Sequence, residues 1–519
     1  MKIALAQINT TTGDVRGNLR LALRQVERAE AEGADLLVLP AWALSGWQPQ
    51  DLALDGEFLN LQNEALDRLE SASEAVPIVA GYARPTCLGD CVPTVALFAG
   101  GESAASLDPE SEPVVSADLP GGTLSLLDPD SLSWEGVGRD ADVAVMPGAE
   151  PYRRGGTEER RHLLGRVTDD LSVPLVWTNL VGGNGELVFD GGSRVLDARG
   201  ELMAAAAAFE EGTLLVDLEL GQPSEAAEET GEISRLYAAL RLGLGDFVRK
   251  TGFEDAVLGL SGGIDSAVVA ALAADALGPE HVMALLMPTR FSSEESRMAA
   301  ETVAENLGIE ARTMSIERLR IAFDEALLPI FRGTDQGVAE ENIQARIRGT
   351  VLMAYASKFN AMPLATGNRS EIAVGYCTLY GDMTGGLAAV GCVPKADIYR
   401  LAHHINRERE IIPQSVISAP PSAELRPDQT DQDDLPPYEV LDEILALRLD
   451  QGRDADAICA RGYNEGLVAE VLGRLKRADF KRRQAAPMLR VGPPGARWPR
   501  LPLGAKLVHM PSESEETHG

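Results

Sequence analysis

The chain has 519 residues, which is long enough for two or more domains with large buried cores. Its 47 basic residues stand against 79 acidic residues, and the formal net charge of −32 makes nucleic acid and anionic membranes poor partners for the surface as a whole. The five cysteines lack disulfide-like spacing, the first residues have no signal-peptide pattern, and no uncharged apolar stretch is long enough to span a bilayer. We therefore expect a cytoplasmic protein with no membrane or nucleic-acid partner.

The first half of the chain alternates short apolar runs with helical patterns, which is typical of an α/β fold. We expect strands at residues 34–39, 76–82, 143–146, 175–178 and 212–218, and helices at 18–33 and 157–169. A stretch rich in Gly, Pro, Ser and Glu follows at residues 221–231 and is the expected linker. The predicted first domain therefore covers residues 1–220.

The second half has the pattern of a parallel sheet, because its strand-like runs are separated by helical segments. The expected strands are 256–260, 281–287, 311–316 and 362–365, preceded by a helix at 232–250. Prolines mark an irregular segment between residues 420 and 437. We expect this second domain to cover residues 232–505, and the Ser- and Glu-rich end at 506–519 to be a disordered tail.

A turn rich in glycine and serine, residues 261–266, lies between an apolar strand pattern and an apolar helix pattern. Gly262 and Gly263 let the backbone approach an anion closely, Ser261 and Ser266 add hydroxyl donors, and the following helix directs its positive end at the same place. Asp265 would repel phosphate unless a divalent cation lay between them. The turn therefore predicts a polyphosphate site with Mg²⁺, and its spacing excludes a Walker A loop.

Other polar segments of the second half would each be ordinary if they stood alone. Asn342 and Arg346 fall on one face of a predicted helix, where charged residues are often only solvated. Thr366 to Glu371 follow the strand-like run at 362–365, at the edge where parallel sheets bind ligands, and Asp382 and Lys395 come next.

Taken in order, these segments resemble the synthetase domain of the glutamine-dependent NAD synthetase family over roughly residues 232–500. The resemblance is carried by residues 261–266, 341–348, 366–371, 376–382, 421–427 and 481–487. The first half resembles the nitrilase-type glutaminase domain of the same family at residues 36–46, 179–183 and 186–193. The implied fold is an N-terminal nitrilase-like α-β-β-α sandwich followed by a Rossmann-like parallel sheet of the ATP-pyrophosphatase type.

The resemblance implies an NAD(+) synthetase, which amidates deamido-NAD through an adenylate and releases AMP and pyrophosphate. It assigns ATP binding to Ser261, Gly262, Gly263, Asp265, Ser266, Thr366, Lys395 and Ser422. It assigns deamido-NAD binding to Asn342, Arg346, Glu371, Asp382 and Lys481, and Mg²⁺ to Asp265 and Glu371. It also implies a homo-oligomer with paired synthetase domains, up to an octamer.

The glutaminase half departs from the family at all three groups that glutamine hydrolysis requires. Ala41 stands where the family has its glutamate base, and no lysine occurs between Lys2 and Lys250. The stretch 125–131, where the family has its cysteine nucleophile, contains no thiol, and Cys87 and Cys91 come too early in the chain. We expect a domain that does not hydrolyse glutamine, and a synthetase that uses ammonia.

Three alternatives stay open from the sequence. A separate glutaminase could dock on the first domain and supply ammonia in trans. The chain could be a silent nucleotide-binding regulator, although intact Asp265, Thr366 and Glu371 argue against that. It could also be another adenylating amide ligase, such as a GMP or asparagine synthetase, although segments 421–427 and 481–487 argue against this.

Overall fold

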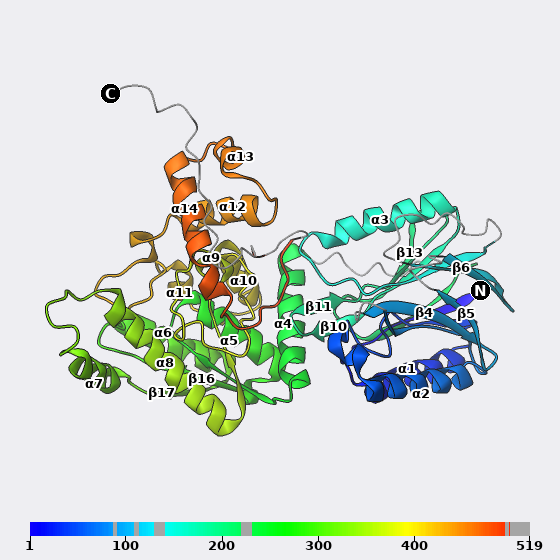
Figure 1. Cartoon of the computed structure of the whole chain (residues 1–519), viewed down its shortest axis with the longest axis horizontal. Coiled ribbons are helices and arrows are strands. Elements are labelled where there is room, and N and C mark those ends of the chain that lie inside the picture. The colour runs from blue at the N-terminus through cyan, green and yellow to red at the C-terminus, as the bar shows by residue number, and fades with distance from the viewer. Residues whose placement is uncertain (87–90, 108–113, 129–140, 220–230, 494–497, 499–519) are drawn as a thin grey trace.

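A computed structural model describes residues 1–86, 91–107, 114–128, 141–219, 231–493 and Trp498. Two α/β domains lie side by side, and helix α4 (Glu232–Lys250) lies between them (Figure 1). The expected linker, apart from Gly231, and the expected tail at 506–519 lie outside the described residues. The domain boundaries expected from the sequence therefore stay predictions.

The N-terminal domain is a sandwich of two six-stranded sheets with helices on both outer faces. The first sheet has the order β14-β1-β2-β3-β4-β5, with β1 (Lys2–Gln7), β2 (Leu36–Val38), β3 (Ile78–Pro85), β4 (Cys91–Ala99), β5 (Glu102–Leu107) and β14 (Gly212–Asp217). The second has the order β13-β12-β9-β8-β7-β6, with β6 (Val114–Leu119), β7 (Gly122–Leu127), β8 (Val143–Pro147), β9 (Leu175–Thr178), β12 (Arg194–Leu196) and β13 (Leu202–Ala205).

Apolar side chains from alternate strand positions fill the space between these two sheets, among them Leu5, Val38 and Val145. The outer face of the first sheet packs against α1 (Val15–Ala31) and α2 (Gly56–Ala72), with the short 3₁₀ helix η1 (Gln50–Leu54) between them in the sequence. The outer face of the second sheet packs against α3 (Gly156–Leu171). This is the α-β-β-α sandwich that the resemblance implied.

The second domain is built on a four-stranded parallel sheet in the order β17-β16-β15-β18. Its strands are β15 (Asp255–Gly259), β16 (Val282–Leu286), β17 (Glu310–Thr313) and β18 (Ala361–Leu364). The helices after α4 are α5 (Ile264–Leu277), η2 (Pro279–His281), α6 (Glu294–Leu307), α7 (Glu317–Leu327), α8 (Val338–Phe359), α9 (Arg369–Val374), α10 (Lys395–Ile405), α11 (Gln414–Ser418), η3 (Asp431–Asp433), α12 (Tyr438–Leu449), α13 (Ala455–Cys459), α14 (Glu465–Arg477) and α15 (Asp479–Arg482). The expected Rossmann-like parallel sheet is present.

Both faces of this parallel sheet are covered, as parallel strands require. Helix α5 is buried on almost every side, because Ala267 to Ala274 are all apolar and all buried. Helix α8 packs on the other face through Ile347, Leu352 and Ala356. Helices α12 to α14 form a smaller apolar cluster of their own beyond α9.

The two domains share one apolar core at α4. Tyr152, Val188 and Phe209 of the N-terminal domain belong to the same buried cluster as Leu236 and Leu240 of α4. The hairpin of β10 (Val181–Asn184) and β11 (Leu187–Asp190) packs directly on this helix. The domain contact is therefore part of the folded core.

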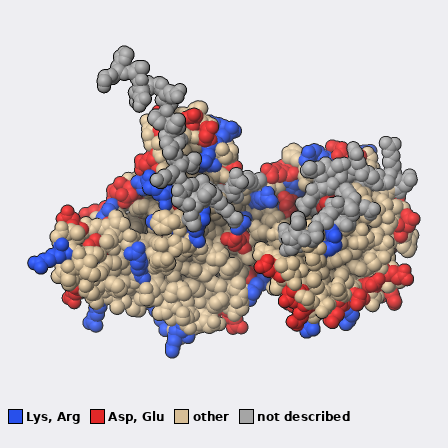
Figure 2. Space-filling view, viewed as in Figure 1, with Lys and Arg blue, Asp and Glu red and all other residues tan. Residues whose placement is uncertain are grey.

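Within the described part of the chain, no helix is both long enough and apolar enough to cross a bilayer. Acidic side chains are prominent on the surface instead. Figure 2 shows them gathered over α1 and α2, whose exposed acidic residues include Glu27, Glu30, Glu64 and Asp67. With a net charge of −32, such a surface repels itself and favours a less compact state at low ionic strength.

Salt should therefore stabilise this protein through screening. Raising NaCl from about 0.01 M to about 0.3 M shortens the range of charge interactions several-fold. We expect the midpoint of thermal unfolding to rise by about 3 °C or more, a shift that corresponds to roughly 1 kcal/mol in domains of this size. Calorimetric scans across this range would measure it. A midpoint that stays flat there and rises only above about 1 M would indicate general salting-out and contradict the argument.

Candidate active site

The phosphate-type turn lies between the end of β15 and the start of α5. Gly262 has a φ of 90°, and a Cβ atom at this position would come within 2.1 Å of the carbonyl oxygen of Ser296. The turn is fixed by its own hydrogen bonds: the Gly263 N–H donates to Ser261 Oγ (3.2 Å), and Ser266 Oγ donates to the Gly263 carbonyl (3.0 Å). Glycine is thus required at residue 262, and the N-terminus of α5 is held in one direction.

The neighbouring strand β18 brings a second polar segment to the same edge of the sheet. Because β15 and β18 are adjacent and parallel, their carboxyl ends meet. Asn368 caps α9 by accepting a hydrogen bond from the Glu371 N–H (3.1 Å), and its Nδ2 donates to Asp265 Oδ1 (2.7 Å). Thr366 and Glu371 therefore face the turn that carries Asp265.

A buried lysine joins these two segments. Lys395 Nζ lies 2.5 Å from Asp265 Oδ2 and 3.2 Å from Glu371 Oε1, and its side chain is only 2% exposed. Burial alone would lower the pKa of Lys395, but the two carboxylates raise it above its usual value. Burial raises the pKa of Glu371 to about 7, and Lys395 opposes this shift. Lys395 is therefore a charged group that holds two carboxylates together.

The same carboxylates fit a divalent cation. Asp265 and Glu371 come from different elements and converge on one positive charge. In the part of the chain that the structure describes, no group of three or more His, Cys, Asp or Glu side chains is arranged to hold a metal on its own. Mg²⁺ is commonly held by one or two carboxylates together with substrate phosphates, so this donor set suits a cation that arrives with a polyphosphate.

A cavity of about 780 Å³ opens over these groups. That volume suits a ligand of nucleotide size. The residues predicted from the sequence that line it are Ser261, Gly262, Gly263, Asp265, Ser266, Asn342, Thr366, Glu371, Asp382, Lys395, Ser422 and Lys481. Arg346 lies outside this set of described lining residues, because its Nε donates to the Leu379 carbonyl (3.2 Å). Arg348, two residues further along α8, lines the cavity instead.

Asp431 and Arg348 are among the charged lining groups that were not assigned from the sequence. Asp431 comes from the irregular proline-rich segment, and burial raises its pKa. Its carboxylate accepts a hydrogen bond from the hydroxyl of Tyr438 (2.7 Å), whose ring lies beneath Lys395. Arg348 was not predicted, because the sequence of α8 does not show which of its arginines faces the cavity. Asp431 had no signal either, since its segment has no regular period.

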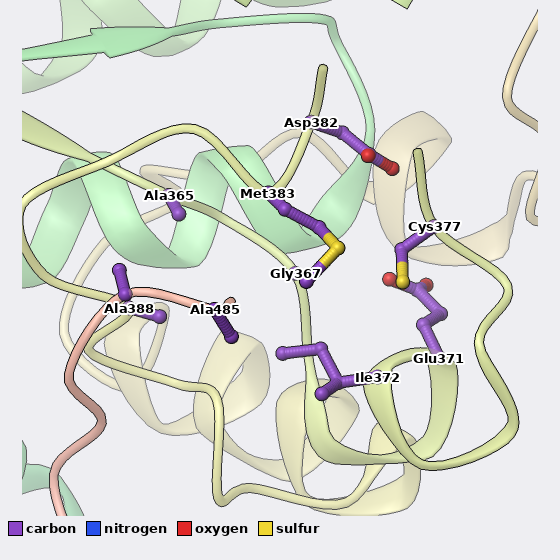
Figure 3. A pocket seen from close by; sticks show the side chains of 10 residues that line it. Ala365, Gly367, Glu371, Ile372, Cys377, Asp382, Met383, Ala388 and Ala485 are labelled. Carbon is purple, nitrogen blue, oxygen red and sulfur yellow. The ribbon is translucent and has the colours of Figure 1, made fainter. Parts of the chain in front are cut away.

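A second, much smaller cavity of about 20 Å³ lies beside the large one, and Glu371 and Asp382 line both (Figure 3). Its other walls are mostly apolar: Ala365, Gly367, Ile372, Cys377, Met383, Ala388, Ala485 and Ala486. A space of this size holds one water-sized molecule. Desolvation raises the pKa of Asp382 to about 6, and the Thr378 N–H opposes the shift.

In the N-terminal domain, Ala41 is 2% exposed and belongs to an apolar cluster that includes Trp42 and Phe189. A Cβ atom at Gly81 would come within 2.5 Å of the Ala41 Cα, so the backbone is closely packed here. Trp47 lies against both aromatic rings, with centroids 5.9 Å from Trp42 and 5.1 Å from Phe189. Ala41 is thus a buried member of a closely packed apolar cluster that contains aromatic rings.

The structure also describes residues near the expected positions of the glutaminase cysteine and lysine. Strand β7 ends at Leu127 and is followed by buried Asp128, while residues 129–131 of the predicted cysteine segment lie outside the described residues. Cys91 begins β4, whereas Cys87 also lies outside the described residues. Lys2 is in β1 and donates to the Glu32 carbonyl (3.3 Å).

Comparison with known proteins decides the family. Residues 236–485 match the NAD synthase family. The glutamine-dependent NAD(+) synthetase of Synechocystis sp. is 37% identical over 98% of this chain and 99% of the relative, and that of Thermotoga maritima is 36% identical over 94% and 95%. The chain belongs to the glutamine-dependent NAD(+) synthetase family.

Solved structures agree with this assignment. The glutamine-dependent NAD(+) synthetase of Acinetobacter baumannii, solved with ADP, is 29% identical, with a TM-score of 0.76 over 96% of this chain and 98% of that one. The glutamine-dependent NAD(+) synthetase structure from Cytophaga hutchinsonii, at 20% identity and a TM-score of 0.82, shares the fold over 97% of both chains. The family resemblance and the two-part fold inferred from the sequence are confirmed.

Removing the charge of Lys395 should destabilise this site in a pH-dependent way. In Lys395→Met, two carboxylates lose their shared partner, which we expect to cost about 3 kcal/mol near neutral pH. Burial raises the pKa of Glu371 to about 7 in the wild type, and loss of Lys395 should raise it further. The variant thus takes up a proton on Glu371 at higher pH than the wild type, and its penalty falls as the pH drops toward about 7. The loss relative to the wild type should therefore shrink between about pH 8 and about pH 6.

Urea unfolding without divalent cations would measure this difference, with Lys358→Met as the control because Lys358 is exposed near the end of α8. A loss that is equal at both pH values, or equal in the two variants, would contradict the assigned role of Lys395.

Proposed function

We propose that the chain is an NAD(+) synthetase that amidates deamido-NAD at the expense of ATP and takes its nitrogen from ammonia. The carboxylate of deamido-NAD attacks the α-phosphate of ATP, pyrophosphate leaves, and ammonia then displaces AMP from the adenylate. The family membership and the cavity of about 780 Å³ over the phosphate-type turn support the synthetase reaction. The ammonia source rests on the missing glutaminase groups.

In this proposal the turn at residues 261–266 and the N-terminus of α5 bind the phosphates of ATP. Thr366, Lys395 and Ser422 contact the same nucleotide, since all three line the cavity. Asn342, Asp382 and Lys481 bind deamido-NAD. Arg346 is the weakest member of the predicted set on geometry, and Arg348 is the better-placed guanidinium.

Asp265 and Glu371 would hold Mg²⁺, which would neutralise the charge of the departing pyrophosphate. Lys395 contributes one positive charge against their two negative charges, so the triad leaves a net negative charge where a polyphosphate must bind. Positioning of the two substrates and neutralisation of charge supply most of the rate, because the adenylate is already activated.

The cavity of about 20 Å³ is the candidate position for the nitrogen nucleophile. It has room for one small molecule, and it adjoins the large cavity through Glu371 and Asp382. The carboxylate of Asp382 there can attract ammonium and accept a proton, and its pKa of about 6 lies close to neutral pH. The apolar walls keep bulk water away from the adenylate.

One observation carries the loss of glutaminase activity: Ala41 stands at the base position, and no lysine occurs between Lys2 and Lys250. A methyl group cannot accept a proton, and Ala41 is buried in an apolar cluster. Lys250 does reach the N-terminal domain. However, its three ammonium protons are donated to Asn9 Oδ1 (2.6 Å), the Thr10 carbonyl (2.8 Å) and the Gly183 carbonyl (2.6 Å).

We further propose a homo-oligomer formed through the synthetase domain. A run of exposed apolar side chains supports it, and such surfaces on soluble proteins usually mark contacts with other chains. These residues lie on α7, on the segment that follows it and on α8: Leu319, Ile321, Phe323, Leu328, Ile330, Val338, Met353 and Phe359. Paired synthetase domains would cover this surface.

The nitrogen source can be tested directly with purified full-length protein, ATP, Mg²⁺ and deamido-NAD. We expect NAD to form with ammonium, and glutamine free of ammonia to give less than about 1% of that rate, because a missing base and a missing nucleophile each remove most of the activity of such sites. Turnover with glutamine would show an unrecognised nucleophile in residues 1–220. Turnover with neither donor would contradict the synthetase assignment and point to another ligase reaction.

The role of Asp265 is tested by Asp265→Asn. The amide keeps the shape of the side chain but removes the charge that would hold Mg²⁺, so we expect turnover with ammonium to fall by about 10³-fold or more. Asn368 and Lys395 still have partners in this variant, and the fold should persist in thermal unfolding. A variant that keeps even a tenth of the wild-type rate would contradict the metal role.

A further inference from the structure

A charged contact connects the N-terminal domain to the helix that carries Lys395. Arg154, which follows β8 in the N-terminal domain, donates from Nη1 to Asp397 Oδ2 on α10. The rest of its guanidinium is paired with Glu232 at the start of α4, with Nε and Nη2 at 2.7 Å and 3.2 Å from the two carboxylate oxygens. Arg154 thus bridges α4 and α10 from the other domain.

Asp397 depends on this contact because it is buried. Its side chain is 3% exposed, and its other charged partner, Arg400, is 63% exposed and lies 3.2 Å away. A buried carboxylate that loses its best-desolvated partner either moves or takes up a proton. The position of Asp397 is therefore set from the N-terminal domain.

Asp397 lies in the first turn of α10, two residues after Lys395. The same turn is held at two other points: the Lys395 N–H donates to Ser370 Oγ (2.9 Å), and the Ala396 N–H donates to Asp442 Oδ2 (3.0 Å). Those anchors come from α9 and α12, within the synthetase domain. Among the described contacts, Arg154 supplies the anchor from outside that domain.

We propose that Arg154 is a positioning residue for nucleotide binding, which it achieves by holding Asp397 and hence the first turn of α10 with Lys395. The proposal rests on the proposed function in one respect, because it takes Lys395 as a residue that contacts ATP. It gives the N-terminal domain a task in the synthetase reaction that needs no glutamine hydrolysis. Loss of the domain contact would then appear as a defect in ATP binding.

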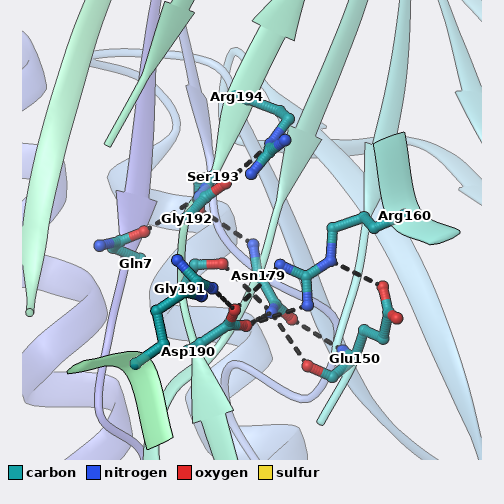
Figure 4. A network of polar contacts seen from close by, with 10 residues as sticks. Gln7, Glu150, Arg160, Asn179, Asp190, Gly191, Gly192, Ser193 and Arg194 are labelled. Atoms are coloured by element: carbon teal, nitrogen blue, oxygen red, sulfur yellow. Dashed lines mark hydrogen bonds and ion pairs between the residues drawn. The ribbon is translucent and has the colours of Figure 1, made fainter. Parts of the chain in front are cut away.

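The chain offers a matched control in a second charged contact between the domains. Asp190 of β11 pairs with Arg160 (3.0 Å) in a buried network (Figure 4). Asp190 also pairs with Arg235 of α4 (2.8 Å). Arg235→Ala removes an arginine that joins the domains, as Arg154→Ala does. Asp190 keeps Arg160, and no described hydrogen bond or ion pair joins Asp190 or Arg235 to α10. The two variants therefore separate domain docking in general from the positioning of α10.

The test is MgATP affinity, measured by titration calorimetry on full-length wild type, Arg154→Ala, Arg154→Lys, Asp397→Asn and Arg235→Ala. Steady-state rates with ammonium accompany the titrations. We expect Arg154→Ala and Asp397→Asn to bind MgATP about tenfold more weakly and to raise the KM for ATP similarly, while the KM for deamido-NAD stays within about twofold. Arg154→Lys should recover part of the affinity, and Arg235→Ala should match the wild type.

Wild-type MgATP affinity in Arg154→Ala would overturn the proposal. An equal loss in Arg235→Ala, or an equal rise in both KM values, would overturn it as well, because either result indicates a general effect of domain docking. If Arg154→Ala does not fold, Arg154→Lys and Asp397→Asn decide by the same measure. If the wild type makes no NAD with ammonium, the proposed function fails, but the binding comparison still decides the role of Arg154.

Discussion

The ammonium group of Lys395 is the interaction on which the synthetase site depends. It joins the turn after β15, which carries Asp265, to α9, which carries Glu371, and it is itself part of α10. One buried charge thus joins carboxylates that lie 130 and 24 residues away from Lys395 in the sequence. Unpaired, each of these groups would be costly in the interior, so they hold the site in shape before a ligand arrives.

The shared core at α4 explains why a domain without its catalytic groups would persist. Tyr152, Val188 and Phe209 pack with α4 in the same cluster as the sheet of the synthetase domain. A chain without the first domain would expose this apolar surface and leave Asp246 and Lys250 without their partners Asn9 and Gly183. Physical dependence of one domain on the other preserves a fold even when its own chemistry is absent.

Sequence reasoning succeeded where local pattern and chemistry coincide. Two glycines and two serines between a strand pattern and a helix pattern predicted the turn at 261–266, because all the residues of such a turn are close together in the sequence. The expected helix at 232–250 has the bounds of α4, and the expected strand at 175–178 has those of β9. The expected edge strand at 311–316 appears as β17 at 310–313, because an exposed edge has no buried partner to define its end.

The rest depends on side-chain direction or on contacts between distant segments. The rotation of α8 about its axis decides whether Arg346 or Arg348 faces the cavity. The sequence does not reveal this rotation, because α8 has the cavity on one side and packed protein on the other. Asp431 reaches the site from an irregular segment, and Arg154 meets Asp397 across 243 residues. None of these positions has a local signal, so only the assembled fold brings them together.

The synthetase site and the glutaminase position lie in different domains, and this separation bears on how an amide ligase obtains its nitrogen. The groups that would bind ATP and the nucleophile surround cavities lined by the second domain, whereas Ala41 lies in the core of the first. What the second domain takes from the first is mechanical: the packing on α4 and the charge of Arg154 at α10. Under the proposed ammonia-dependent reaction, these contacts give the first domain a structural role that needs no chemistry of its own.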